Sequence, residues 1–121
     1  MLSELRTAIT SILDLSPDIR YVAIYRNDTL EMAQRESIED ASASESDRYE
    51  ELLVNPTLLT LVKARGDIDC GGASFVVVGY GNFLQLVVAL PDGHASVCFA
   101  KGSDPVSHVD AVLAACDGRS T

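Results

Sequence analysis

Residues 73–100 constrain the fold most, because they contain three short β-rich segments in a row. The segments are Ala73–Val78, Phe83–Leu90 and Ala95–Ala100. Gly79-Tyr80-Gly81-Asn82 and Pro91-Asp92-Gly93-His94 separate them, and both separators are rich in turn-forming residues. Consecutive strands that are joined by short turns usually pair as neighbours, so the sequence predicts an antiparallel meander.

Two more β-rich segments lie nearer the N-terminus. Ile19–Arg26 is rich in Ile, Val and Tyr, and Thr29–Arg35 alternates Leu, Met and Gln with Glu, Ala and Arg. Asn27 and Asp28 lie between the two segments, and both residue types tolerate positive φ. The pattern predicts a hairpin.

The first and last predicted elements are amphipathic helices. Apolar side chains recur at three- and four-residue steps from Leu2 to Leu13, and Pro17 follows as a helix breaker. The last helix starts at Asp104-Pro105, a capping residue followed by a first-turn proline, and stops at Gly118.

A third helix is predicted in the middle of the chain, from Asp47 to Arg65, with Gly66 as its C-terminal stop. Pro56 lies inside this range, where a proline removes one backbone hydrogen bond and clashes with the preceding turn. Asn55-Pro56 would instead suit the start of a helix. The sequence therefore allows one kinked helix or two short ones.

The predicted order is α-β-β-α-β-β-β-α, an α+β fold with a five-stranded antiparallel sheet. Val22–Ile24 and Leu86–Leu90 are apolar on both sides of their strands, so helices are expected on both faces of the sheet. A length of 121 residues indicates one domain, residues 1–121. Residues 36–47 carry five carboxylates and one large apolar side chain, and are predicted to form a mobile acidic loop. The alternative is an acidic recognition segment.

The charge balance excludes several classes of partner. Lys and Arg total 9 against 18 Asp and Glu, which gives a formal charge of −9. An acidic protein repels phosphate backbones and anionic lipid surfaces, so neither nucleic-acid binding nor membrane docking is expected. Membrane insertion is not expected either, because no apolar run is long enough to span a bilayer. The three cysteines and the absence of a signal-like N-terminus lead us to expect a cytoplasmic protein.

The sequence offers little that points to catalysis. It contains neither a Walker-type phosphate loop nor a Rossmann glycine pattern. Cys98 falls inside a predicted strand, and neither His94 nor His108 is at a spacing diagnostic of a cysteine–histidine pair. Asp104 and His108 are four residues apart, but two ligands are too few for a metal site. No catalytic residue, cofactor or metal is therefore predicted, and an enzyme using Cys70 or Cys98 is the alternative.

The chain resembles the roadblock / dynein light-chain family, which has a profilin-like fold. The resemblance spans about residues 2–116. It rests on the order of elements, on RYVAIYRNDTLEMAQ, and on LLTLVKARGDIDCGGASFVVVGYGNFLQLVVALPDGHASVCFA followed by a linker and a helix. Three features depart from the family pattern: a turn at Asn27-Asp28 in place of Asp-Gly, the interruption of the second helix by Pro56, and a long acidic loop.

The resemblance implies a protein without enzymatic chemistry of its own. Family members dimerise and serve as platforms for small GTPases, motor subunits or other roadblock proteins. The implied sheet order is 2-1-5-4-3, with a homodimer formed by third strands and second helices. The implied dimer and partner interface is Leu58, Leu59, Val62, Ala73, Phe75 and Val77.

The residues themselves give a separate reason to expect a partner. Ala-Ser-Phe-Val-Val-Val, residues 73–78, contains no Lys, Glu or Pro that would protect an edge strand from pairing with another chain. The first alternative is that Phe75 and Val77 are ordinary core residues. The second is a small-ligand sensor or binding module, which would need an apolar pocket near Tyr21, Tyr25 or Tyr80.

Overall fold

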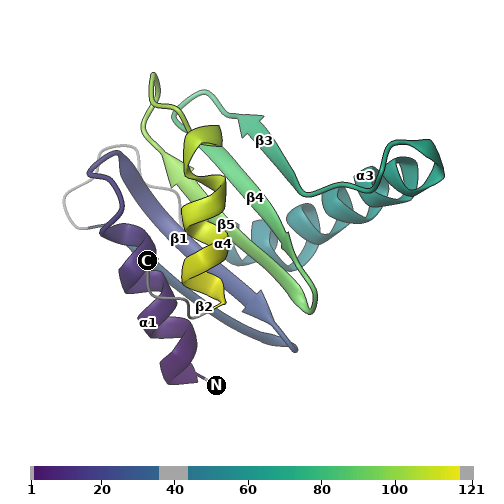
Figure 1. Ribbon diagram of the computed structural model, residues 1–121. Helices are drawn as coiled ribbons and strands as arrows, with labels where there is room; N and C mark the ends of the chain where they lie inside the picture. Colours follow the sequence, from purple (N-terminus) through teal and green to yellow (C-terminus); the bar gives the residue numbers. More distant parts are fainter. Residues whose placement is uncertain (1, 36–43, 118–121) are drawn as a thin grey trace.

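Five antiparallel strands form one sheet in the order β2-β1-β5-β4-β3, as the family resemblance implied (Figure 1). The computed structural model describes residues 2–35 and 44–117. The strands are β1 (Ile19–Arg26), β2 (Thr29–Gln34), β3 (Phe75–Gly79), β4 (Leu84–Leu90) and β5 (Gly93–Phe99). Asn27 and Asp28 have φ values of 49° and 65° in the turn between β1 and β2, so the predicted hairpin is confirmed.

Helices cover both faces of the sheet, which confirms the predicted α+β class (Figure 1). Helix α1 (Leu2–Leu13), the 3-10 turn η2 (Val106–His108) and helix α4 (Val109–Cys116) lie on one face. Helix α2 (Ser44–Tyr49), the π-helical segment η1 (Glu50–Val54) and helix α3 (Asn55–Asp69) lie on the other. The far end of α3 projects beyond the β3 edge of the sheet.

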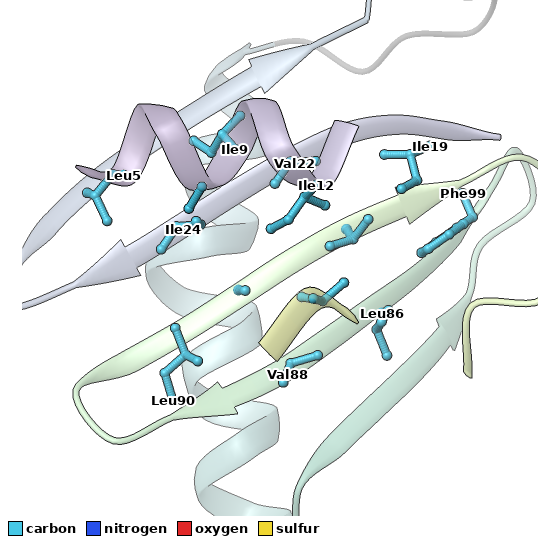
Figure 2. Packing of buried hydrophobic residues seen from close by; sticks show 14 residues of the cluster. Leu5, Ile9, Ile12, Ile19, Val22, Ile24, Leu86, Val88, Leu90 and Phe99 are labelled. Carbon is cyan, nitrogen blue, oxygen red and sulfur yellow. The ribbon is translucent and has the colours of Figure 1, made fainter. Parts of the chain in front are cut away.

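The main hydrophobic core lies between the sheet and the α1/α4 layer (Figure 2). Helix α1 contributes Leu5, Ile9 and Ile12, whose spacing places them on the one face that the helix buries. The strands contribute a second set, which includes Val22, Ile24, Leu86, Val88, Val97 and Phe99. Each large side chain buried in this way stabilises the fold by about 1.5–3 kcal/mol relative to exposure.

The middle helix is continuous through Pro56, with a local change of winding. Proline has no N–H to donate to the preceding turn, and the segment immediately before it is wound as a π-helix. In that segment the N–H of Asn55 donates to the carbonyl oxygen of Glu50, five residues earlier. The helix therefore neither breaks nor ends at Asn55-Pro56.

The helical region begins earlier than the sequence suggested. Residues 44–47, assigned to the acidic loop, form the first turn of α2. Glu45 and Asp47 lie in that turn, where a carboxylate interacts favourably with the positive end of the helix dipole. The remainder of the predicted loop, residues 36–43, lies outside the described residues.

The predicted stop at Gly66 is wrong, because the helix continues to Asp69. Gly66 is buried, and its carbonyl oxygen accepts hydrogen bonds from the N–H groups of Cys70 and Gly72. A Cβ on Gly66 would stand 2.4 Å from the carbonyl oxygen of Gly72. The glycine therefore allows the chain after the helix to fold back closely, and Gly71 and Gly72 make that reversal with φ of 80° and 93°.

Candidate functional site

Strand β3 forms one edge of the sheet and pairs with β4 alone among the described strands. Phe75 and Val77 lie opposite Val88 and Leu86, so they are on the α1/α4 face, and Phe75 packs against the main core. Val77 is 38% exposed. Ala73 precedes the strand and is half-buried. The outer edge of β3 thus presents backbone hydrogen-bonding groups beside an exposed apolar side chain.

Helix α3 lies on the other face of the sheet, beside the same edge. Leu59 is buried against the sheet, with 7% of its surface exposed, whereas Leu58 is half-buried and Val62 is exposed. Two of the six predicted interface residues, Phe75 and Leu59, thus make contacts within this chain. The interface assignment itself stays a prediction.

Sequence reasoning missed the most exposed apolar side chains of α3. Leu61 is 64% exposed and Ile68 is 75% exposed. These residues are seven apart, so they lie on one side of the helix, and this heptad spacing was the signal that could have found them. The name α3/β3 surface is used here for the outer edge of β3 together with four exposed apolar residues, Leu61, Val62, Ile68 and Val77.

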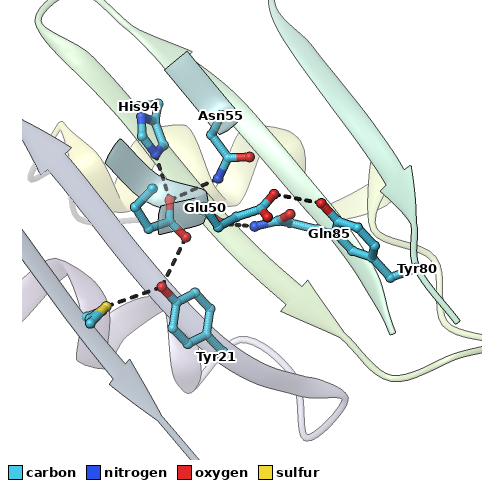
Figure 3. Close-up of polar contacts among 9 residues, drawn as sticks. Tyr21, Glu50, Asn55, Tyr80, Gln85 and His94 are labelled. Atoms are coloured by element: carbon cyan, nitrogen blue, oxygen red, sulfur yellow. Dashed lines mark hydrogen bonds and ion pairs between the residues drawn. The ribbon is translucent and has the colours of Figure 1, made fainter. Parts of the chain in front are cut away.

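A buried polar network lies beneath η1 (Figure 3). Its centre is the Glu51 carboxylate, which is 0% exposed. Oε1 lies 2.7 Å from Nε2 of His94 and accepts a hydrogen bond from Nδ2 of Asn55 at 2.9 Å, and Oε2 accepts one from the Tyr21 hydroxyl at 3.0 Å. The network therefore ties η1 to β1 and β5.

The environment of this network changes the acidity of its tyrosine. Burial raises the pKa of Tyr21 far above its ordinary value, and the neighbouring Glu51 carboxylate raises it further. Tyr21 is therefore a neutral hydrogen-bond donor to Glu51 at physiological pH. Sequence reasoning did not find the network, because Glu51 stands among other acidic residues on what reads as a solvated helix face.

A pocket of about 340 Å³ opens beside the network. Tyr21, Glu50, Glu51 and Tyr80 are among the residues that line it, and the Tyr80 hydroxyl donates to Oε2 of Glu50 at 2.8 Å (Figure 3). Partial burial and the bond to Glu50 raise the pKa of Tyr80 to about 12. The third tyrosine that sequence reasoning considered, Tyr25, instead donates to Oδ1 of Asp28 at 3.2 Å.

Two of the three cysteines, Cys98 and Cys116, have environments that disfavour the thiolate form. Burial raises the pKa of the Cys98 thiol well above its ordinary value, and the nearby Glu51 carboxylate adds to this effect. Burial also raises the pKa of Cys116 to about 11. Both thiols are thus protonated near neutral pH, whereas a cysteine nucleophile reacts as the thiolate. Cys70 is exposed, and its thiol donates to Oδ1 of its neighbour Asp69 at 3.3 Å.

The described residues provide neither a cluster of metal ligands nor a membrane-spanning helix. Within residues 2–35 and 44–117, no three His, Cys, Asp or Glu side chains gather closely enough to hold a metal ion. None of the described helices has the length and apolar character needed to cross a bilayer.

Comparison with known proteins identifies the fold. No family model and no curated protein matches the sequence. Among solved structures, a Roadblock/LC7 domain from Streptomyces avermitilis superposes with a TM-score of 0.69 at 13% identity, covering 92% of this chain and 90% of that domain. MglC from Myxococcus xanthus superposes with a TM-score of 0.57 at 14% identity, covering 95% of both chains. The chain therefore has the roadblock fold.

Proposed function

We propose that this protein is a non-catalytic interaction module that forms a homodimer through the α3/β3 surface. The observation that carries the proposal is an unguarded edge strand beside a helix that exposes large apolar side chains. Phe75–Gly79 has the sequence FVVVG, without a Lys, Glu or Pro to oppose pairing with a second chain. The roadblock fold supports the proposal, because the resemblance of this sequence to the roadblock family implied such a dimer.

Burial of apolar surface would drive this association. Leu61, Ile68 and Val77 are each more than a third exposed, and covering a large apolar side chain contributes roughly 1.5–3 kcal/mol before the costs of association are subtracted. Pairing of β3 with its copy would also satisfy backbone N–H and C=O groups at the sheet edge. Because the chain carries a charge of −9, an apolar interface suits two copies better than a charged one.

The decisive experiment is sedimentation velocity on the wild type and on Leu61→Asp. We expect a dimer at micromolar concentration for the wild type and a monomer for the variant, because a buried carboxylate opposes association. Leu61 is 64% exposed, so the variant should fold normally. Val106→Asp is the matched control, because Val106 is 53% exposed but belongs to η2, on the face of the sheet opposite to α3. A wild-type chain that stays monomeric would refute the proposal.

The dimer is further proposed to act as a platform for a small GTPase or another roadblock-type protein. The partner class comes from the family resemblance. It can be tested by affinity purification from cells of the source organism, with the wild type and Leu61→Asp compared side by side. Recovery of a small GTPase or a roadblock-type protein with the wild type supports this assignment. Partners of other classes alone would overturn it and leave the dimer proposal standing.

A further inference from the structure

The 340 Å³ pocket beside η1 combines acidic side chains with aromatic rings in its lining. Asp47, Glu50 and Glu51 bring three carboxyl groups to it, from α2 and η1. Both oxygens of Glu51 already accept hydrogen bonds inside the chain, and Oε2 of Glu50 accepts one from Tyr80. No Lys, Arg or His is among the described residues that line the pocket.

Gln85 supplies an acceptor that has no partner. The side chain is 1% exposed and lines the pocket from β4. Its Nε2 donates to Oγ of Ser96 at 2.7 Å, while its Oε1 is buried and accepts no hydrogen bond within the described structure (Figure 3). A buried acceptor without a donor is costly, and a bound donor would remove that cost.

Aromatic rings complete the wall. Tyr80 and Phe83 both line the pocket, with ring centroids 5.3 Å apart. The Arg20 guanidinium lies 5.6 Å from the Phe83 centroid, so this wall already accepts one cation from the protein itself. The three carboxyl groups belong to the lining itself, whereas Arg20 and His94 lie beside it, the latter 2.7 Å from Oε1 of Glu51.

We propose that this pocket binds a small organic cation through a guanidinium or primary ammonium group. Such a group donates several hydrogen bonds, which suits the carboxylates and the unpartnered Oε1 of Gln85, and it packs favourably against aromatic faces. In this arrangement the cation donates to Oε1 of Gln85 and pairs with the Glu50 carboxylate. An anion would meet like charge there, and the described residues that line the pocket offer no cationic side chain to hold it.

The size of the pocket limits the ligand. A volume of 340 Å³ is at the lower end of the range for small-molecule sites, which is roughly 300–1,000 Å³. It suits a short alkyl amine or alkyl guanidine, or a single arginine or lysine side chain. A second hollow, of about 940 Å³, lies beside α1 and α4. The described residues have two buried polar atoms without a partner, Oδ1 of Asn55 and Oε1 of Gln85, and neither residue lines this hollow.

The test is titration calorimetry of the full chain at pH 7 with agmatine, which carries both groups. N-butylurea, which is neutral and of similar shape, is the matched negative probe. A blocked Gly-Arg-Gly tripeptide distinguishes a free amine from an arginine side chain presented on a backbone. We expect agmatine to bind and N-butylurea to show at least tenfold weaker binding. Tighter binding of the tripeptide than of agmatine would assign the cation to a peptide. Equal affinity for agmatine and N-butylurea, or no binding of agmatine or the tripeptide, would overturn the proposal.

Variants locate the binding. Glu50→Gln should weaken agmatine binding by about tenfold or more, because a charge-assisted hydrogen bond is lost. Glu45→Gln is the matched control, because it removes the same charge from α2 at an exposed residue outside the pocket, and it should change affinity less than twofold. Equal losses in both variants would indicate general attraction to an acidic protein and would refute a specific site. A second readout is the NMR chemical shifts of the remaining tyrosine rings in Tyr80→Phe, recorded while agmatine is added.

Discussion

The Glu51 carboxylate and the His94 imidazole lie 2.7 Å apart, and both side chains are almost completely buried. Glu51 belongs to the π-helical segment before Pro56, and His94, 43 residues later, is the second residue of β5. The contact therefore joins the helical layer to the centre of the sheet on the face that has the smaller apolar cluster.

We expect Glu51→Leu to destabilise the protein by about 3–5 kcal/mol. The variant leaves His94, Asn55 and Tyr21 without their common acceptor, and groups left unpaired in a buried network carry the full cost of desolvation. Equilibrium urea unfolding measures the change. Glu45→Leu, at an exposed residue of α2, should stay within about 0.5 kcal/mol of the wild type. Similar losses in both variants would show that the network contributes little.

Acid should destabilise the fold through Asp92. The Arg26 side chain donates from Nε to Oδ1 of Asp92 at 2.8 Å, which holds the pKa of that carboxyl below its ordinary 3.8. Because the folded pKa is the lower one, the stabilisation is complete above about pH 4 and is lost as the pH falls through the folded pKa. Asp92→Asn should therefore lower the urea midpoint at pH 7. Between pH 5 and pH 2 the urea midpoint of the variant should fall less than that of the wild type. An identical acid profile in both proteins would contradict this assignment.

Glu50 should contribute to the pH profile with the opposite sign. Partial burial raises its pKa above the ordinary 4.5, even though the bond from Tyr80 acts the other way. A raised folded pKa means that the folded protein binds the proton more tightly, so this group adds stability below its unfolded pKa and that contribution is lost as the pH rises. Glu50→Gln should thus keep or slightly increase the urea midpoint at pH 7. A clear loss of stability at pH 7 would show that the charged form is needed for folding.

The strands were predictable because local pattern and tertiary environment agree in them. Ile19–Arg26 is β-rich in sequence and buried on both faces, and its bounds match β1 at both ends. The order of strands was implied by the family resemblance and is confirmed by the pairing of β1 with β5. The sequence could not place the end of α3, because the predicted stop at Gly66 came from local propensity alone. In the structure Gly66 is needed for its close approach to the backbone of Gly72, which is a tertiary contact.

The polar network was beyond sequence reasoning for a related reason. Glu50 and Glu51 are adjacent and chemically identical, yet one is half-buried at a pocket and the other is completely enclosed. The π-helical winding before Pro56 decides which of them faces the sheet, and an ideal helical period does not reproduce that winding.

Gly66→Ala should destabilise the protein, although alanine favours helices. The added Cβ would stand 2.4 Å from the carbonyl oxygen of Gly72, so the backbone must shift. Overpacking of this kind costs about 1–3 kcal/mol, which exceeds or offsets the gain of about 1 kcal/mol in helix propensity. Gly81→Ala is the control, because a Cβ there meets no atom within 4 Å. Thermal unfolding of both variants checks the prediction, and a more stable Gly66→Ala variant would contradict it.

The three thiols should differ strongly in reactivity. With iodoacetamide at pH 8, Cys70 should react first, because it is exposed at the end of α3. Burial raises the pKa of Cys116 from 9.0 to about 11, which lowers its thiolate fraction roughly a hundredfold, and Cys98 is more enclosed still. Peptide mapping by mass spectrometry should find Cys70 modified within the time that leaves the other two intact, and all three modified at similar rates in 6–8 M urea. Rapid modification of Cys98 in the folded protein would contradict this prediction, because that thiol is buried.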